Sequence, residues 1–218
     1  MLDIGCGYGA FVLEARRRGI DACGIEPAEF EVDFARQRLA AELPEDDPLQ
    51  VYRLGSGLNL VFAARLFDVV TLWNVLEHLP DYRRLLGEVE RVLKPGGRVY
   101  VICPNYAAFR KEAHYLVFWP PLLPRPLAKS YLRLLGKNPA FFETSIFYRT
   151  NWGVLRALRQ NGLAVYDPRI RKILDPSLVT NPGKLYWLSL IKQLRLLWLV
   201  RLGLTLTQLN PFKSSVML

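Results

Sequence analysis

The chain has 218 residues, of which 51% are hydrophobic and 12% aromatic, and its formal net charge is +9. This length and apolar content exclude an intrinsically disordered chain and suit one full domain, alone or with an appendage. The charge is uneven, because residues 1–50 hold 11 acidic and 5 basic side chains while residues 151–218 hold 2 acidic and 10 basic ones.

Short apolar runs alternate with amphipathic segments through the first half of the chain. The apolar runs predict strands at 1–5, 20–27, 49–54, 66–73 and 98–104. The segments between them predict helices at 11–19, 29–43 and 81–94, the last with Tyr82, Leu85, Leu86, Val89, Val92 and Leu93 at helical spacing. Pro95-Gly96-Gly97 is expected to end this helix. Strands that alternate with helices imply a parallel α/β sheet with right-handed crossovers.

The character of the sequence changes after Pro104. Residues 114–139 are rich in proline, aromatic and basic residues, and we expect no regular core element there. Residues 151–162 predict a helix and residues 163–170 a sixth strand. Residues 184–209 predict one long, very apolar final helix.

Three glycines on alternate residues, Gly5, Gly7 and Gly9, follow the first strand. A glycine turn between a strand and a helix exposes backbone N–H groups beside a helix N-terminus, where a polar or anionic ligand group binds. Glycines also form plain tight turns, and the spacing up to Ala10 satisfies the loose dinucleotide fingerprint G-x-G-x-x-G/A. The turn alone therefore leaves both its role and its ligand open.

Two acidic residues near the glycine turn separate these alternatives. Asp3 lies inside the first strand, where a dinucleotide fold normally carries apolar residues, and an acid there suits the ammonium group of an amino acid. Glu26 ends the second strand, where a carboxylate accepts hydrogen bonds from both hydroxyl groups of a ribose. An ammonium together with a ribose describes S-adenosylmethionine (SAM) better than a pyrophosphate cofactor.

Four segments, LDIGCGYG, GIEP, FDVVTLWNVLEHL and LKPGGRVYVICPN, resemble successive motifs of the class I SAM-dependent methyltransferases in order and spacing. They cover about residues 2–105. The resemblance implies an α/β fold with a Rossmann-like, doubly wound and mainly parallel seven-stranded sheet, whose last strand is antiparallel. We predict a SAM-binding domain at 1–175, a proline- and aromatic-rich insert or lid at about 106–150, and a basic, apolar helical extension at 176–218.

The resemblance also implies which residues surround SAM. Asp3 and the three glycines would line the methionine part, Glu26 would take the ribose, and Asn74 and Val75 would border the reaction centre. The full predicted cofactor-binding set is Asp3, Gly5, Cys6, Gly7, Gly9, Glu26, Pro27, Ser56, Asn74 and Val75.

Two features depart from the family pattern. Ser56 stands where the family usually offers an aspartate to the adenine amino group, so Ser56 or a backbone carbonyl would have to substitute. The chain also begins inside the first strand, whereas the family has a helix before that strand that closes over SAM. We expect either that the start is misassigned or that the chain is a fragment.

Methyl transfer from a sulfonium is an in-line displacement that depends on alignment, and a base helps only when the acceptor loses a proton. His78, which follows the fourth strand, is the candidate base, and a structural, hydrogen-bonded loop histidine is the alternative. Related ubiquinone-pathway O-methyltransferases hold a metal with a similar E-x-x-E-H stretch. Here Asn74 replaces the first acid and leaves only Glu77 and His78, so we expect no metal.

His114 and Tyr115 open the insert, in the region that caps the substrate pocket in this family. We predict that these two residues contact the substrate. The alternative is that they pack within an amphipathic lid.

The basic residues of the second half lie among Leu, Trp and Pro, which does not fit a nucleic-acid partner. In the last predicted helix Trp187, Leu194 and Trp198 share a face with Ile191, and basic residues interrupt the apolar run too often for a transmembrane span. Residues 184–209 therefore predict peripheral contact with a membrane interface, and packing on the domain or a dimer face is an equal alternative.

These patterns predict SAM-dependent methyl transfer to a small, lipophilic or lipid-linked acceptor, such as a quinone precursor, with oxygen favoured as the acceptor atom. A catalytically silent SAM-binding or scaffold protein at a membrane surface is the alternative, and a nicotinamide-dependent oxidoreductase is disfavoured. The cysteines Cys6, Cys23 and Cys103 fit no paired or metal-ligand spacing. With no recognisable secretory signal, they predict a cytoplasmic protein that lies at the inner face of a membrane. The sequence leaves the oligomeric state open.

Overall fold

The computed structural model describes residues 1–164, 177, 182–200, 202–203 and 215–217. Its main sheet has the strand order β3-β2-β1-β4-β5-β8. These strands are β1 (Leu2–Ile4), β2 (Cys23–Glu26), β3 (Tyr52–Leu54), β4 (Phe67–Trp73), β5 (Leu93–Pro104) and β8 (Ser215–Met217). The first five run parallel, and β8 pairs antiparallel with β5. The mainly parallel α/β class is confirmed, whereas the main sheet has six strands within the described residues and not the predicted seven.

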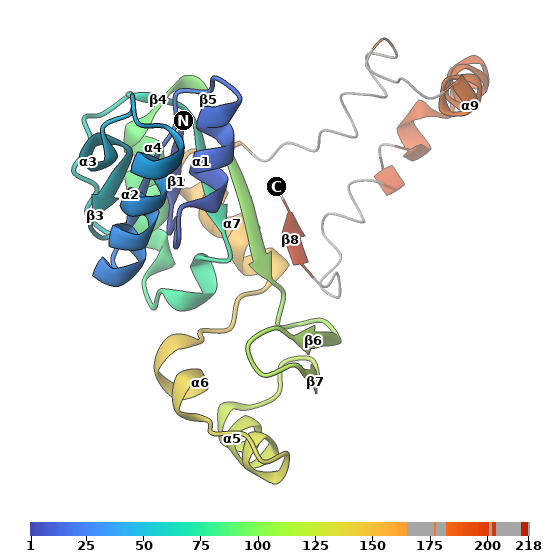
Figure 1. Ribbon diagram of the computed structural model, residues 1–218. Helices are drawn as coiled ribbons and strands as arrows, with labels where there is room; N and C mark the ends of the chain where they lie inside the picture. The colour runs from blue at the N-terminus through green and yellow to red at the C-terminus, as the bar shows by residue number, and fades with distance from the viewer. Residues whose placement is uncertain (165–176, 178–181, 201, 204–214, 218) are drawn as a thin grey trace.

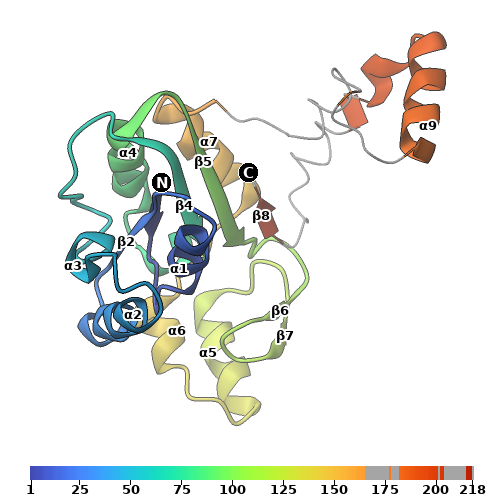
Figure 2. The same cartoon turned by 45° about the horizontal axis from the view of Figure 1, so that its top comes forward.

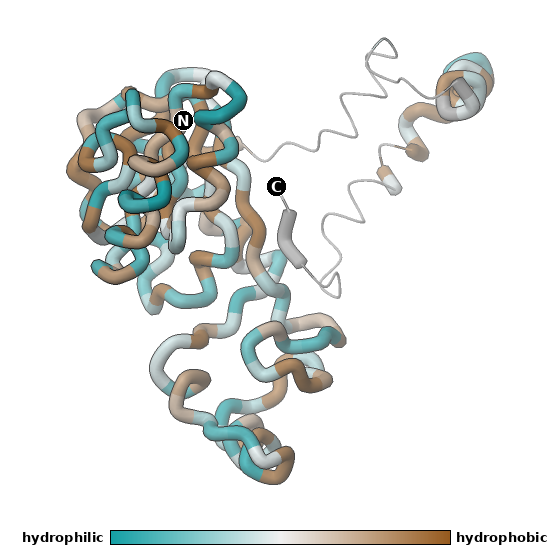
Figure 3. The backbone as a smooth tube through the Cα atoms, viewed as in Figure 1, coloured by the Kyte–Doolittle hydropathy of each residue, from teal (hydrophilic) through white to brown (hydrophobic). Residues whose placement is uncertain are grey.

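Helices cover both faces of this sheet (Figures 1 and 2). On one face, α1 (Ala10–Arg17) and α2 (Glu29–Glu42) bury their apolar residues in a cluster that includes Tyr52. On the other, α4 (Tyr82–Val92) and α7 (Asn151–Gln160) pack against apolar residues of β1, β4 and β5. The six positions chosen from helical spacing are all buried, although the last of them, Leu93, belongs to β5. Figure 3 shows the corresponding pattern, with hydrophobic stretches along the strands and alternating character along the helices.

The third and fifth strands differ from their predicted bounds. Residues 48–51 form a short helix, α3 (Pro48–Val51), because Pro48 suits the first turn and the Asp47 side chain accepts a hydrogen bond from Leu49 N. The strand expected from residue 49 therefore starts at Tyr52. Strand β5 starts before Pro95-Gly96-Gly97, because Leu93 already pairs with Phe67, and the register then shifts before Val69 meets Arg98. The glycines thus form an irregularity within the strand.

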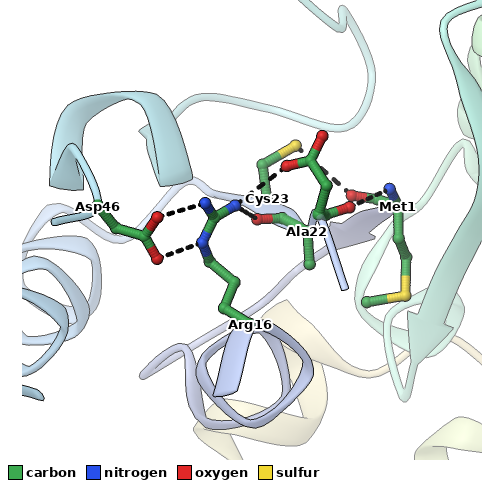
Figure 4. Close-up of polar contacts among 6 residues, drawn as sticks. Met1, Arg16, Ala22, Cys23 and Asp46 are labelled. Atoms are coloured by element: carbon green, nitrogen blue, oxygen red, sulfur yellow. Dashed lines mark hydrogen bonds and ion pairs between the residues drawn. The ribbon is translucent and has the colours of Figure 1, made fainter. Parts of the chain in front are cut away.

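Arg16, in the last turn of α1, joins three segments (Figure 4). Its guanidinium donates to the Asp46 carboxylate, to Ala22 O at 2.9 Å and to Asp21 Oδ1 at 3.1 Å. Asp46 lies between α2 and α3, and Ala22 directly precedes β2. The network therefore fixes the entry into the strand that carries Glu26 at its end.

The insert lobe (residues 106–150) stands apart from the sheet and its helices in Figure 1. It contains β6 (Arg110–Glu112), β7 (Val117–Trp119), α5 (Arg125–Leu134) and α6 (Ala140–Ser145). It has an apolar core of its own, made of Tyr106, Tyr115, Trp119, Ala128, Leu132, Phe142 and Ile146. Tyr106 N donates to Arg149 O at 2.8 Å, so the chain enters and leaves the lobe through one narrow neck.

The expectation of no regular core element at 114–139 was wrong, because β7 and α5 lie there and bury Trp119, Ala128 and Leu132 in the core of the lobe. Proline does not prevent α5, since Pro124 precedes it as the N-cap and Pro126 occupies the first turn, where no backbone donor is lost. Ala128 and Leu132, four residues apart, bury the inner face of α5 in the core of the lobe.

The single long C-terminal helix was also a wrong prediction. Helix α9 (Pro182–Gln193) is followed by Arg195 at a φ of 55°, with Leu196 N donating to Ile191 O at 3.0 Å and Arg195 N to Lys192 O at 3.1 Å. These paired bonds form a Schellman motif, which ends a helix. The face proposed to link Trp187 with Trp198 therefore does not run through one helix.

Two predictions reach beyond the described residues: the sixth strand from residue 165 on, and residues 201 and 204–209 of the final helix. Within the described part of the chain, no helix combines the length and apolar content needed to cross a bilayer.

Candidate functional site

The glycine turn joins β1 to α1, and all three glycines adopt left-handed backbone conformations. Gly5, Gly7 and Gly9 have φ angles of 71°, 51° and 74°, which are costly for residues with a Cβ. A Cβ on Gly5 would lie 2.6 Å from Val75 Cγ2, and one on Gly9 would lie 2.6 Å from Tyr52 Cε1. A Cβ on Gly7 would meet only the Glu31 carboxylate, at 3.6 Å. Gly5 and Gly9 are thus needed for close packing. At Gly7, by contrast, the space beside the backbone stays open to a ligand.

Glu26 lies beside this turn and is oriented by backbone donors. Gly7 N donates to Oε2 and Ala28 N to Oε1, each at 3.1 Å. A carboxylate oxygen can accept two hydrogen bonds, so each oxygen retains one position for a further donor. Glu26 therefore fits a ligand that offers two neighbouring hydroxyl groups, as a ribose does.

Asp3 is buried within β1, with 2% of its surface exposed. Thr71 Oγ1, on the neighbouring strand β4, donates to its carboxylate at 2.6 Å. Burial raises the pKa of Asp3 to about 7, although the Thr71 hydrogen bond acts in the opposite direction. A nearby cation would favour the ionised form of such a group. This chemistry suits an ammonium partner, and that role stays a prediction.

Cys6 and Pro27 flank Glu26 in different ways. Cys6 packs on β2, where a Cβ on Gly24 would lie 2.6 Å from the cysteine sulfur. Burial raises the pKa of the Cys6 thiol well above its ordinary value, so the group is an uncharged packing residue. Pro27 is exposed directly after Glu26.

Ser56 lies in the exposed loop after β3. Its Oγ accepts a hydrogen bond from Leu58 N at 3.2 Å, and Gly55 N donates to Glu26 O at 3.0 Å. The loop is thereby joined to the end of β2, which puts Ser56 close in the fold to the ribose-binding candidate. Its contact with adenine stays a prediction.

Asn74 and Val75 lead from β4 into η1 (Leu76–His78). Asn74 has a φ of 56° and donates from its backbone N to Ile102 O at 2.8 Å. The left-handed residue turns the chain back, so that Val75 packs directly on Gly5. The loop after β4 and the glycine turn therefore form one continuous edge at the carboxyl ends of the strands, where ligands of open α/β sheets bind.

Comparison with known proteins agrees with this arrangement. Residues 2–101 match the model of a methyltransferase domain. These residues, just under half of the chain, resemble a class I methyltransferase domain. The cofactor implied by this family is SAM.

The chain is similar to two methyltransferases of quinone biosynthesis. It is 31% identical over 138 residues to the demethylmenaquinone methyltransferase of Oceanobacillus iheyensis, covering 60% of this chain and 56% of the relative. It is 27% identical over 163 residues to the ubiquinone biosynthesis O-methyltransferase of Rhizobium etli, covering 66% and 63%. The chain thus spans between half and two thirds of the length of these relatives.

A solved structure shares the fold. The SAM-dependent methyltransferase of Mesorhizobium loti superposes with a TM-score of 0.55 at 23% identity, covering 76% of this chain and 74% of that one. At this level of identity the likeness shows the fold alone.

Where the methyltransferase domain meets the insert lobe, the structure brings His78 and His114 together. Their ring centroids lie 5.1 Å apart and the rings are nearly perpendicular, at 87°. His78 Nδ1 lies 2.8 Å from Ser145 O. The carbonyl can only accept, so Nδ1 carries the proton and Nε2 retains its lone pair. Both the base role and the structural role predicted for His78 are compatible with this geometry.

Tyr115 lies in the core of the insert lobe, with only 9% of its surface exposed. Its hydroxyl accepts a hydrogen bond from Phe142 N at 2.8 Å. This placement gives Tyr115 a packing function, and its contact with substrate stays a prediction.

Sequence reasoning missed Glu112, the residue that holds His114. Glu112 is fully buried and lies 2.8 Å from His114 Nδ1 through its Oε1. The sequence Glu112-Ala113-His114 places an acid two residues before a histidine, which is the one local signal that could have singled it out.

Glu77 carries a second unexpected feature. It is fully buried in η1, and within the described residues neither of its carboxylate oxygens has a hydrogen-bond partner. Burial raises the pKa of Glu77 to about 7. Within that same part of the chain, no three His, Cys, Asp or Glu side chains lie close enough to hold a metal ion together. Glu77 and His78 therefore have no third ligand there.

Proposed function

We propose that the chain transfers the methyl group of SAM to a small, lipophilic acceptor, with an oxygen as the acceptor atom. The observation that carries this proposal is the open glycine turn beside Glu26, whose two oxygens are aimed by Gly7 N and Ala28 N. When bound, SAM supplies an activated methyl group on a sulfonium. The chain would supply the alignment, which accounts for roughly 7–11 kcal/mol in reactions of this kind.

Specific residues would hold the parts of the cofactor. Glu26 would bind the ribose hydroxyls, and Asp3 would interact with the ammonium group of the methionine part. Val75, packed on Gly5, would border the reaction centre. Ser56, joined to β2 through Gly55 N, would approach the adenine.

The relatives support a lipophilic, quinone-type acceptor. One is named for demethylmenaquinone and the other for O-methylation in ubiquinone biosynthesis. A phenolic hydroxyl of a prenylated ring is therefore the acceptor that we propose.

Turnover tests this function. The protein is incubated with methyl-labelled SAM and a short-chain prenylated catechol, and the organic extract is counted. We expect label in the extract and demethylated cofactor in the aqueous phase. Calorimetric binding of SAM without any transfer to this acceptor would instead support the catalytically silent alternative.

We also propose that residues 182–200, called the α9 region, contact a membrane and hold the protein at the cytoplasmic face of that membrane. Figures 1 and 2 show α9 clear of the sheet and of the insert lobe. The exposed fractions are 62% for Trp187, 60% for Trp198 and 58% for Leu194. Exposed tryptophan and leucine beside Lys192 and Arg195 suit an interface that contains anionic lipid.

Flotation with phosphatidylglycerol liposomes tests this contact. We expect wild type to float and the double variant Trp187→Ser, Trp198→Ser to remain in solution. Trp152→Ser on α7 is the matched control, because Trp152 is 60% exposed and lies outside the α9 region. Equal behaviour of the control and the double variant would contradict the proposal.

A further inference from the structure

The turn of the β6–β7 hairpin carries a carboxylate–imidazole pair. Glu112 is fully buried and its carboxylate collects four donors. Its Oε2 accepts from His114 N and Tyr115 N, each at 2.8 Å, and its Oε1 accepts from Tyr106 OH at 3.1 Å and from His114 Nδ1 at 2.8 Å. The hairpin backbone thus fixes the carboxylate, and the carboxylate fixes the imidazole.

This arrangement decides which nitrogen of His114 is available. Because Nδ1 donates to a carboxylate, the proton of the neutral ring sits on Nδ1, and Nε2 presents a lone pair. About 26% of the His114 side chain is exposed, so the ring lies at an accessible border and not in the core. A carboxylate behind a partly exposed imidazole orients the ring and stabilises the imidazolium that forms when Nε2 takes up a proton.

His114 faces the methyltransferase domain. His78, in η1, approaches its ring edge to face, and Phe141 of α6 lies 5.2 Å from His114 and 6.0 Å from His78, measured between ring centroids. The segment that carries His78 begins at Val75, which packs on Gly5 of the glycine turn. Glu112 and His114, called the dyad below, are therefore linked through a short stretch of chain to the cofactor edge, which is the edge formed by the glycine turn, Glu26 and the loop after β4.

The two histidines differ in basicity for physical reasons. The hydrogen bond that His114 Nδ1 donates to Glu112 raises the pKa of His114 above its ordinary value, partly opposed by burial, and the charges of Glu77 and Arg110 act in opposite directions. Burial lowers the pKa of His78, and the charge of His114 lowers it further, opposed by Ser145 O and Glu112. Of the two, His114 is the better proton acceptor.

We propose that His114 is the general base of the methyl transfer and that Glu112 is its positioning residue, an inference that rests on the proposed O-methylation. The acceptor oxygen attacks the methyl carbon as its proton passes to His114 Nε2. The bond between methyl carbon and sulfur breaks, and its electron pair stays on sulfur, which gives neutral S-adenosylhomocysteine. The imidazolium on His114 is neutralised by the Glu112 carboxylate until water removes the proton.

This assignment moves the base from His78, the candidate from sequence, to His114. It also names the acceptor class, because a hydroxyl that is protonated at neutral pH, such as a simple phenol, gains from a base. An acceptor that is already ionised does not.

Acceptor acidity provides the kinetic test. Wild type and His114→Asn are compared on a prenylated catechol and on a nitrocatechol that is ionised at the assay pH. We expect His114→Asn to lose about 10²- to 10⁴-fold in kcat on the protonated acceptor and less than tenfold on the ionised one. Calorimetric affinity for SAM should stay within about twofold, because the dyad lies outside the cofactor residues.

Several outcomes would overturn the proposal. Equal losses on the two acceptors would show a structural role for His114, and an acidity-dependent loss in His78→Asn alone would return the base to His78. If wild type binds SAM but methylates neither acceptor, the proposed function fails and the inference falls with it. Transfer by wild type with no loss in His114→Asn rejects the inference alone.

A measurement without turnover tests the positioning role. The chain has two histidines, so their imidazole signals can be assigned by NMR in wild type and in single variants. We expect His114 to titrate above, and His78 below, the ordinary value of about 6.5. Glu112→Gln should lower the pKa of His114. The control Glu143→Gln should leave that pKa unchanged, because Glu143 lies on α6 of the same lobe and pairs with Lys129. Coincident titration of both histidines in wild type would contradict the dyad, even if Glu112→Gln does not fold.

Discussion

The cofactor edge and the insert lobe both orient a carboxylate with backbone N–H groups, but they use it differently. At the cofactor edge, Gly7 N and Ala28 N aim Glu26 and leave part of each oxygen for a ligand. In the insert lobe, Glu112 is saturated by protein donors, and His114 is the group left for a ligand. At the cofactor edge these donors come from the backbone alone, whereas Glu112 also accepts from the Tyr106 hydroxyl and the His114 ring. The first arrangement needs glycine at fixed places, and the second joins donors that lie two to six residues from Glu112.

The largest effect should come from filling the packed part of the glycine turn. Gly9→Ala would place a Cβ 2.6 Å from Tyr52 and 2.7 Å from Ala35, at a φ of 74°. We expect a loss of about 2–5 kcal/mol in the free energy of unfolding, from strain and overpacking together. Urea denaturation followed by circular dichroism measures it.

Gly19→Ala is the matched control, because Gly19 has a φ of 75° but no atom within 4 Å of an added Cβ. It should lose about 1–2 kcal/mol through backbone strain alone. Equal losses in the two variants would mean that close packing does not distinguish Gly9.

The next effect concerns two buried acids, Asp3 in β1 and Glu77 in η1, both with a pKa raised to about 7 by burial. An acid whose pKa is raised in the folded state binds its proton more tightly there, so it lowers stability as the pH rises from about 4 to about 7. Asp3→Asn and Glu77→Gln should each remove about 2–4 kcal/mol of this decline.

Denaturation at both ends of that pH range measures the difference, with Glu29→Gln, an exposed site, as control. Addition of SAM should shrink the gain of Asp3→Asn if the cofactor ammonium lies near Asp3. A stability profile of either acid variant that parallels wild type would contradict the raised pKa.

A third prediction addresses ligand binding at the cofactor edge. Glu26→Gln should lower the affinity for SAM about 10- to 100-fold, because an amide replaces the charged carboxylate that accepts hydrogen bonds from two hydroxyl groups. Calorimetry measures the affinity, and Glu29→Gln again serves as control. Unchanged affinity in Glu26→Gln would remove the ribose assignment.

The smallest effect should come from the residue that joins the two regions. Arg149 donates from Nε to Leu76 O at 2.9 Å and from Nη2 to Leu79 O, so it ties η1 to the exit of the insert lobe. Arg149→Lys cannot make both bonds and should lose about 1 kcal/mol. Thermal denaturation measures it against Arg156→Lys, an exposed control on α7. A larger loss of stability in Arg156→Lys than in Arg149→Lys would show that the hydrogen bonds of Arg149 do not stabilise the fold.

The cofactor edge could be predicted from sequence because its determinants are local. The glycine spacing, the acid at the end of β2 and the apolar period of α4 each lie within one element. Other features have local determinants that the apolar pattern does not report. The strand start at Tyr52 follows from the Asp47 cap, and α9 ends because Arg195 adopts a left-handed conformation that sequence assigns to glycine. Glu112 was missed because its donors, which lie two to six residues away, leave no mark on the apolar pattern.

The hydrogen bond between Tyr106 N and Arg149 O has a consequence for how proteins with this fold diversify. Because the two ends of the insert lobe lie side by side and its apolar core is separate, exchange of the whole unit has to match two chain junctions and the contacts that the lobe makes with η1. Under the proposed function, a chimaera that keeps the sheet with its helices and borrows a foreign lobe should then take on the acceptor preference of the lobe's source.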